Sequence, residues 1–290
     1  MSGFPPLQQI SGLSEVAGAY QFLLCDVWGV IHNGLEHFRP AGAALVRFRD
    51  RGGRVVLVSN APRPSTVIRT QLDRLGVERA AYDDIVTSGD VSRDLLSARP
   101  GARIYSIGPE RDLPIYGGLD VALVGEQEAD LVACTGLFDD ETETPDHYAE
   151  LLRRLAARGL PMLCMNPDIV VERGDRLVWC AGALAQRYRL FGGETIVVGK
   201  PHPEIYAAAL KRIEALAGRP VPTTALLAVG DGAETDIRGA NSAGIDALFI
   251  TGGIHATTFG ERDRPSADAI VTFLMAAGLS ARAFAPRLVW

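Results

Sequence analysis

Short runs of apolar and β-branched residues alternate with longer segments of helical period along most of the chain. The apolar runs cover residues 21–27, 54–58, 130–134, 161–165, 195–198, 225–229 and 245–250. The helical segments cover residues 41–51, 65–75, 88–97, 144–158, 182–189, 203–216 and 234–243. Apolar strands joined by helices are typical of a parallel sheet that is covered on both faces. The alternation therefore predicts an α/β fold with a doubly wound, Rossmann-like parallel sheet.

Polar side chains follow three of these runs at the point where each predicted strand ends. Residues 21–25 of the first run lead into Asp26, the second run leads into Ser59 and Asn60, and the sixth leads into Gly230 and Asp231. Ligands of an open parallel sheet bind beyond the carboxyl ends of its strands. We therefore expect these residues to converge on one crevice, although they are far apart in the chain.

The middle of the chain has a strand and helix alternation of its own. It includes a predicted hairpin with strands at 169–171 and 177–179. We therefore predict an inserted α/β domain at residues 84–191, within a core domain formed by residues 1–83 and 192–290.

Composition excludes several classes of partner. The net charge is −6 and the basic residues are scattered, so no basic surface is expected for nucleic acid or an anionic bilayer. The four cysteines are too far apart in the chain for a CxxC pair or a clustered zinc site. Residues 1–20 lack the pattern of a signal peptide, and no apolar stretch is long enough to span a membrane. We expect a cytoplasmic protein with a small-molecule ligand and with neither nucleic acid nor membrane as partner.

The polar residues suit attack by a carboxylate on phosphorus. Two anions approach each other only if a cation and fixed donors relieve their repulsion. Asp26 is the candidate nucleophile, Asp231 a second carboxylate for a metal, Ser59 and Asn60 donors to phosphoryl oxygens, and Lys200 the fixed positive charge. Magnesium is the expected cofactor, because it prefers oxygen ligands and one or two carboxylates plus substrate phosphate.

Two further residues near these positions have two interpretations each. Asp236 could orient a metal-bound water, or it could be a first-turn acid that stabilises a helix through the macrodipole. Arg63, just after Asn60, could reach a phosphate or could be a solvated loop residue.

Four stretches together resemble the haloacid dehalogenase (HAD) superfamily, and specifically the NagD-like phosphatases of subfamily IIA, which have a large inserted C2-type cap. The stretches are LLCDVWGVIHNG (23–34), VLVSNAPRP (56–64), VVGKPHPEIY (197–206) and VGDGAETDIRGANSAG (229–244). They occur in the family's order, cover the whole core and leave room for the cap.

The resemblance implies a metal site and a covalent mechanism. Asp26 would attack the substrate and form an aspartyl phosphate. Mg²⁺ would be bound by Asp26, by the main-chain carbonyl of Trp28 and by Asp231, with Asp236 as a further member of the metal set.

The resemblance also implies where the substrate binds. Ser59 and Asn60 match the second motif of the family, and Lys200 matches the third. MNPDIVVERG (165–174) resembles the cap segment that faces the active site, so Asn166 and Asp168 are candidate substrate contacts. The implied substrate is a small phosphorylated metabolite, such as a sugar phosphate or a nucleotide, and a homodimer is an expectation of the same kind.

The chain departs from the family at Trp28. Family phosphatases usually carry an aspartate at this position, two residues after the nucleophile, where it protonates the leaving group and then activates water. General acid and base catalysis contributes about 10²- to 10⁴-fold. Either another residue replaces the acid, or the substrate has a good leaving group.

His32 is the candidate replacement, because an unperturbed imidazole titrates near neutral pH. The alternative is that His32 forms only local hydrogen bonds in its loop. Two other function classes stay open: a weakly active or regulatory protein that binds a phosphorylated ligand, and a 2-haloacid dehalogenase, since those enzymes have an aromatic residue at the position of Trp28.

Overall fold

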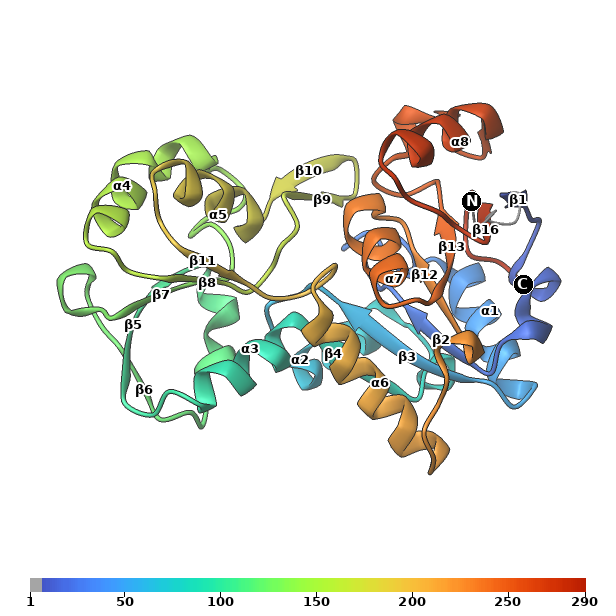
Figure 1. Cartoon of the computed structure of the whole chain (residues 1–290), viewed down its shortest axis with the longest axis horizontal. Coiled ribbons are helices and arrows are strands. Elements are labelled where there is room, and N and C mark those ends of the chain that lie inside the picture. The colour runs from blue at the N-terminus through green and yellow to red at the C-terminus, as the bar shows by residue number, and fades with distance from the viewer. Residues whose placement is uncertain (1–6) are drawn as a thin grey trace.

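The computed structural model describes residues 7–290 and has two lobes (Figure 1). Residues 1–6 lie outside the described residues. They begin both the predicted core domain and the stretch that was considered for a signal peptide. One lobe, here called the core, is built on a seven-stranded sheet in the order β1-β16-β13-β12-β2-β3-β4, with all neighbours parallel. Its strands are β1 (Gln8–Gln9), β2 (Phe22–Cys25), β3 (Arg54–Ser59), β4 (Asp84–Thr87), β12 (Leu226–Gly230), β13 (Asp246–Ile250) and β16 (Ala283–Ala285).

Helices cover both faces of the core sheet. They are α1 (Arg39–Asp50), α2 (Ser65–Leu75), α3 (Ser88–Ser97), α6 (Pro203–Ala217), α7 (Arg238–Ser242) and α8 (Ala267–Ala276). Side chains of β2 alternate between the faces: Phe22 and Leu24 pack in the cluster that contains α6, whereas Leu23 and Cys25 pack in the cluster that contains α1 and α2. Every position of β2 is thus buried, which explains its continuous apolar run, and the helices on both faces of the sheet confirm the doubly wound α/β prediction.

The second lobe, here called the cap, is built on a five-stranded parallel sheet in the order β11-β8-β7-β5-β6. Its elements are β5 (Ala102–Ile107), β6 (Val121–Leu123), β7 (Leu131–Cys134), α4 (Ala149–Ala157), β8 (Met162–Cys164), α5 (Ala181–Leu190) and β11 (Thr195–Val197). The predicted hairpin is confirmed as the antiparallel pair β9 (Val170–Arg173) and β10 (Arg176–Trp179). A second short hairpin, β14 (Gly260–Glu261) with β15 (Arg264–Pro265), belongs to the core lobe.

Sheet membership bears on where the chain crosses between the lobes. β4 pairs with β3 in the core sheet, so the core extends beyond residue 83. β11 pairs with β8 in the cap sheet, so the cap extends beyond residue 191. The division into 1–83 with 192–290 and 84–191 stays a prediction, and we propose later crossings, after 97, where the core helix α3 ends, and after 197. Edge strands carry no pattern that assigns them to one sheet or the other.

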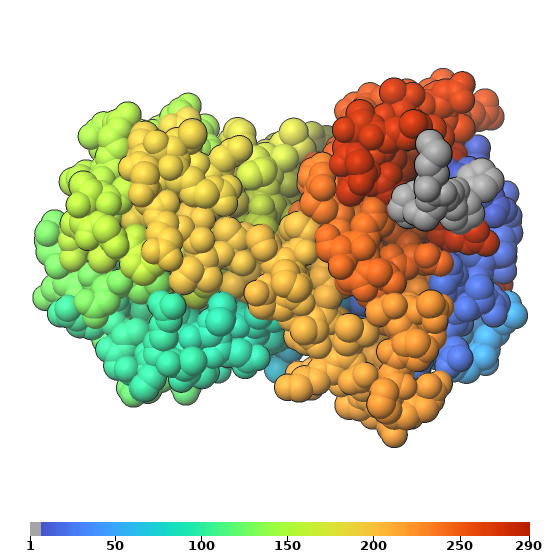
Figure 2. All heavy atoms as spheres, viewed as in Figure 1, coloured from blue at the N-terminus to red at the C-terminus, as the bar shows by residue number. Residues whose placement is uncertain are grey.

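The two lobes touch over a narrower waist in the middle of the molecule (Figure 2). One hydrophobic cluster runs through both, from Leu24 and Val58 in the core to Ile104 and Leu163 in the cap. No helix of residues 7–290 is both long and apolar enough to cross a membrane.

Candidate active site

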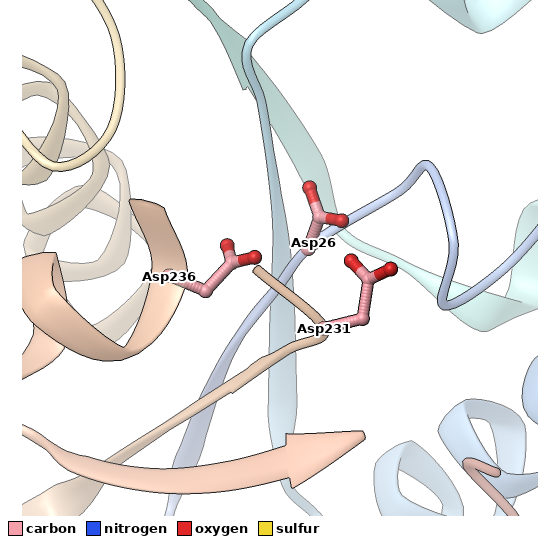
Figure 3. A group of neighbouring side chains, drawn as sticks. All are labelled: Asp26, Asp231 and Asp236. Carbon is pink, nitrogen blue, oxygen red and sulfur yellow. The ribbon is translucent and has the colours of Figure 1, made fainter. Parts of the chain in front are cut away.

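Three buried carboxylates meet at the carboxyl edge of the core sheet. Asp26 follows β2, Asp231 follows the neighbouring strand β12, and Asp236 lies in the π-helical turn η8 (Ala233–Ile237). One oxygen from each of the three lies within 4.8 Å of the others. Figure 3 shows the carboxyl groups facing one another. The structure thus brings together Asp26 and Asp231, which the strand ends predicted, and Asp236, for which the sequence left a metal role and a helix-stabilising role open.

Backbone geometry holds these residues in place. The N–H of Asp26 donates to the carbonyl of Val229 at 2.8 Å, which continues the pairing of β2 with β12. The N–H of Gly232 donates to Oδ2 of Asp236 at 2.9 Å. A Cβ atom at Gly230 would lie 2.2 Å from Cγ of Asp236, so only glycine lets the two segments approach this closely. The π-helical turn replaces the first turn of the helix predicted at 234–243.

Lys200 supplies the positive charge within the carboxylate group. Its ammonium donates to Oδ1 of Asp26 and, at 2.7 Å, to Oδ1 of Asp236, and its side chain is almost fully buried. Burial alone would lower the pKa of Lys200, but the carboxylates of Asp236 and Asp26 raise it well above its usual value. Lys200 therefore stays charged at neutral pH.

The carboxylates are crowded and short of counter-charge. Burial raises the pKa of Asp26 to about 7, with Lys200 opposing and Asp236 adding to the rise. Burial also raises the pKa of Asp231 well above its usual value, and the neighbouring Asp26 and Asp236 add to it. Three carboxylates against one lysine leave two negative charges, which a divalent cation would balance. The donor set of carboxylate oxygens fits Mg²⁺, the predicted cofactor.

The second motif contributes the hydroxyl of Ser59, which can still donate, and the side-chain amide of Asn60, which is already hydrogen-bonded. Ser59, at the end of β3, accepts through Oγ from the N–H of Ala61 at 3.2 Å, so its own proton is available to a ligand. The Asn60 side chain accepts from the N–H of Lys200 at 2.7 Å and donates to Oδ1 of Asp168 at 2.8 Å. Asn60 thus joins the lysine backbone to the cap and has less capacity for the predicted phosphoryl contact.

The cap places Asn166 and Asp168 in the same pocket, from the loop that follows β8. Oδ1 of Asn166 accepts from the N–H of Asp168 at 3.1 Å, which fixes the loop. Burial raises the pKa of Asp168 to about 6, although Asn60 and Lys200 oppose the rise. A Cβ atom at Gly182 would lie 2.2 Å from the carbonyl oxygen of Pro167, so glycine is needed for α5 to begin against this loop.

The structure does not bring His32 to the pocket, whereas Trp28 is part of the pocket wall. His32 lies against the indole edge of Trp28, with ring centroids 5.0 Å apart, and is 2% exposed. Its Nδ1 accepts from the N–H of Gly34 at 2.9 Å, and burial lowers its pKa to about 4. A neutral, enclosed imidazole cannot donate a proton to a leaving group at pH 7. We therefore do not retain His32 as the replacement acid and favour its local loop interpretation.

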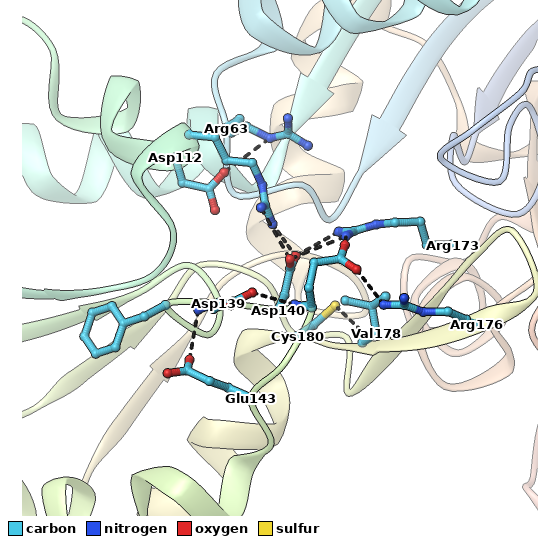
Figure 4. Close-up of polar contacts among 12 residues, drawn as sticks. Arg63, Asp112, Asp139, Asp140, Glu143, Arg173, Arg176, Val178 and Cys180 are labelled. Carbon is cyan, nitrogen blue, oxygen red and sulfur yellow. Dashed lines mark hydrogen bonds and ion pairs between the residues drawn. The ribbon is translucent and has the colours of Figure 1, made fainter.

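Sequence reasoning missed a second charged group on the pocket wall. Arg63, for which the sequence left a phosphate contact and a solvated loop residue open, is partly buried and lies beside Asp112 of the cap (Figure 4). Arg111, Asp140 and Arg173, also of the cap, line the same pocket. No motif marks these cap residues, because they come from three separate segments that meet only in the folded chain.

Comparison with known proteins agrees with this geometry. Residues 23–121 match the family described as haloacid dehalogenase-like hydrolase, and residues 197–277 match the family described as HAD-hydrolase-like. The chain is 47% identical to a hydrolase of the haloacid dehalogenase-like family from Brucella suis 1330, whose crystal structure it matches with a TM-score of 0.86. The match covers 98% of this chain and 100% of that chain.

This chain belongs to the haloacid dehalogenase-like hydrolase family.

Other members of the haloacid dehalogenase-like family place it in the NagD-like group. It is 27% identical to D-glycerol 3-phosphate phosphatase from Mycobacterium tuberculosis, over 84% of this chain and 66% of that protein. It therefore spans just under two thirds of the length of that relative. It is 26% identical to 5'-nucleotidase YutF from Bacillus subtilis, over 88% of this chain and 98% of that protein.

It is also 26% identical to ribonucleotide monophosphatase NagD from Escherichia coli, over 80% of this chain and 88% of that protein. Crystal structures of the glycerol phosphate phosphatase from M. tuberculosis, one in complex with calcium and one with magnesium, match this haloacid dehalogenase-like chain with TM-scores of 0.62 and 0.63. Both matches have 26% sequence identity and cover 82% of this chain. They cover 68% of the calcium-bound chain and 69% of the magnesium-bound chain.

Proposed function

We propose that this chain is a divalent-metal-dependent phosphatase that hydrolyses a small phosphorylated metabolite, such as a sugar phosphate or a nucleotide, through Asp26. The observation that carries the proposal is the buried group of Asp26, Asp231 and Asp236 with Lys200 bonded to two of them. The phosphatases and nucleotidases among its relatives support the same reaction class.

The residues divide the chemistry among them. A bound divalent cation, for which Mg²⁺ is our choice, would be held by Asp26, Asp231 and Asp236 and would neutralise charge on the phosphoryl group. Lys200 stabilises the phosphoryl oxygens from the side of Asp236, and Ser59 donates its hydroxyl proton to one of them. The predicted ligand role of the Trp28 carbonyl belongs to this proposal, and no N–H among residues 7–290 donates to that carbonyl.

Asp26 attacks phosphorus in line, a bond forms between its carboxylate oxygen and phosphorus, and the bond to the leaving oxygen breaks. Water then attacks the aspartyl phosphate and releases inorganic phosphate. Trp28 offers no carboxyl group to protonate the leaving oxygen, so we infer a preference for substrates whose leaving group is already acidic. Loss of a general acid costs about 10²- to 10⁴-fold on poor leaving groups.

The test is release of inorganic phosphate from p-nitrophenyl phosphate, aryl esters of graded leaving-group pKa, acetyl phosphate and a panel of phosphorylated metabolites, with Mg²⁺ and with EDTA. We expect Mg²⁺-dependent release that rises steeply as the leaving group becomes more acidic. Asp26→Asn should remove it, while Asp94→Asn, a matched change at an exposed position of α3, should retain it. Full activity in Asp26→Asn would refute the nucleophile.

Assays on the same purified protein also test the two other function classes, a regulatory binding protein and a dehalogenase. No release from any ester, together with tight binding of a phosphorylated compound, would favour the weakly active or regulatory binding protein, which the missing acid at Trp28 keeps open. Halide release from 2-haloacids in EDTA would favour a dehalogenase. The buried carboxylates argue against that reading, because displacement of halide needs no cation and their charge would stay uncompensated.

A further inference from the structure

The pocket that contains Asp26 and Lys200 is also lined by a second charged group, here called the arginine cluster. Its members are Arg63 of the core and Arg111, Asp112, Asp140 and Arg173 of the cap. The mechanism proposed above uses none of these residues. Figure 4 shows the cluster, with Arg63 beside Asp112 and the carboxylate of Asp140 next to the guanidinium of Arg173.

Arg63 is the least satisfied member of the cluster. Its side chain is 19% exposed, and its Nε is fully buried without a hydrogen-bond partner among residues 7–290. The carboxylate of Asp112 is 3.5 Å from Nε, which is an ion pair without a hydrogen bond. Buried donors in native proteins are almost always bonded, because a buried donor without a partner is destabilising. Arg63 also lines the pocket, and none of its guanidinium N–H groups donates a hydrogen bond to another residue among 7–290, so the guanidinium keeps donors for a ligand there.

The other two arginines share one carboxylate. Arg173 Nη2 donates to Oδ2 of Asp140 at 2.8 Å, and Arg111 donates to the same oxygen. Within the cluster, three arginines face two aspartates, which leaves one positive charge in excess. Adding Glu141, which pairs with both Arg173 and Arg176, together with Arg176 itself, leaves that excess unchanged.

We propose that the arginine cluster binds a second anionic group of the substrate, so that the substrate is a phosphorylated molecule with another carboxylate or phosphate. This inference rests on the proposed function, which assigns the first phosphoryl group to Asp26 and Lys200. A guanidinium presents a planar fork of N–H donors that matches an oxyanion, and an anion also balances the excess charge. A neutral alcohol or amide could accept one hydrogen bond from Arg63 but would leave the charge uncompensated.

The test compares substrates that differ only in the second group. One series contains phosphooxy carboxylic acids of two to five carbons, with their neutral amides as partners. The other contains bisphosphates of the same chain lengths, with the matching alkyl monophosphates as partners. We expect kcat/KM for the best acid or bisphosphate to exceed that of its neutral partner by about 10- to 100-fold, because a charged hydrogen bond contributes on that order. The series that shows the larger ratio identifies the anion as carboxylate or phosphate.

Arg63→Gln should reduce this ratio to near one, and Arg63→Lys, which keeps the charge but not the fork, should leave an intermediate ratio. Arg173→Gln provides a second route if Arg63→Gln does not fold, which thermal unfolding will show. Arg103→Gln is the matched control, since Arg103 pairs with Asp130 on the exposed surface of the cap. Equal kcat/KM for the charged compound and its neutral partner in both series for the wild type, or an equal loss for both compounds in Arg63→Gln, would overturn the inference.

Calorimetric binding of the same compounds to the Asp26→Asn variant separates this inference from the proposed function. Tighter binding of acids or bisphosphates than of their neutral partners would support the arginine cluster even if no compound is hydrolysed. In that case only the phosphatase proposal fails. Equal affinities for the charged compounds and their neutral partners, together with normal hydrolysis of p-nitrophenyl phosphate by the wild type, would reject the anion-binding role of the arginine cluster. The phosphatase proposal would then stand.

Discussion

The indole Nε1–H of Trp28 donates a 2.5 Å hydrogen bond to the main-chain carbonyl of Glu172, on the first strand of the cap hairpin. The same hairpin contacts the core through the N–H of Gly174, which donates to the carbonyl of Asn33 at 3.1 Å. The Glu172 carboxylate also lies 3.4 Å from the guanidinium of Arg262 in the core. The residue at the position of the family's usual acid therefore fastens the cap over the nucleophile.

Replacing Trp28 by Phe should loosen this hairpin while keeping an aromatic ring against His32. A neutral hydrogen bond contributes about 0.5–1.5 kcal/mol, so local opening of β9 and β10 should become roughly 2- to 10-fold more frequent. Hydrogen exchange of the amides of residues 170–179 measures this opening, and amides of β7, the central strand of the cap sheet, serve as the internal control. Unchanged exchange in the hairpin would mean that the indole bond contributes nothing to cap closure.

Replacing Trp28 by Asp should restore a proton donor beside Asp26. We expect hydrolysis of esters with poor leaving groups to rise at least about tenfold, and the dependence of kcat/KM on leaving-group pKa to become flatter. Trp28→Asn is the matched control, because it has the same shape and also loses the bond to Glu172, but it carries no acid. A rise of equal size in both variants would show that cap opening, rather than proton transfer, is responsible.

Replacing Lys200 by Met should leave Asp26, Asp231 and Asp236 crowded without their internal cation. Removing one partner from a buried ion pair typically costs about 3–5 kcal/mol, so we expect a loss of that order in the free energy of unfolding measured in EDTA. Mg²⁺ should then raise the melting temperature of Lys200→Met by more than it raises that of the wild type. Equal shifts would mean that the cation does not bind among these carboxylates.

Replacing His32 by Asn should make stability less sensitive to acid. The pKa of His32 is about 4 in the folded protein and 6.5 in a model peptide, so the unfolded chain binds the proton first as the pH falls. His32 therefore contributes stability that is present above about pH 6.5 and is lost toward pH 4, amounting to about 2 kcal/mol between pH 7.5 and 5. Asn can still accept from the N–H of Gly34.

Urea unfolding gives the free energy of unfolding of wild type and His32→Asn at pH 7.5 and at pH 5. Subtracting the pH-dependent change of the variant from that of the wild type cancels the contribution of the carboxylates. The same pH dependence in wild type and Asn variant would show that His32 titrates normally and is more accessible than its 2% exposure indicates.

Much of the core could be predicted from local pattern. The apolar runs at β2, β3 and β12 are buried on both faces, which is why they read as continuous strands, and the residue that follows each strand reaches the same edge of a parallel sheet. Strands that are short or lie at an edge, such as β4, β6 and β16, were missed, because a run of three or four residues carries too little periodicity. The helix at Ala267–Ala276 was missed as well.

By itself, the sequence determined the parallel α/β class and the convergence of Asp26 with Asp231, because strand polarity brings the carboxyl ends to one edge whatever the loops do. Only the tertiary structure decided that His32 lies behind Trp28, that Asn60 is bonded to Asp168, and that Arg63 faces three cap segments. The contacts of Asn60 and Arg63 join residues that are distant in the chain and depend on how the cap packs against the core, whereas the place of His32 depends on how its own loop folds. No local periodicity or spacing encodes that packing.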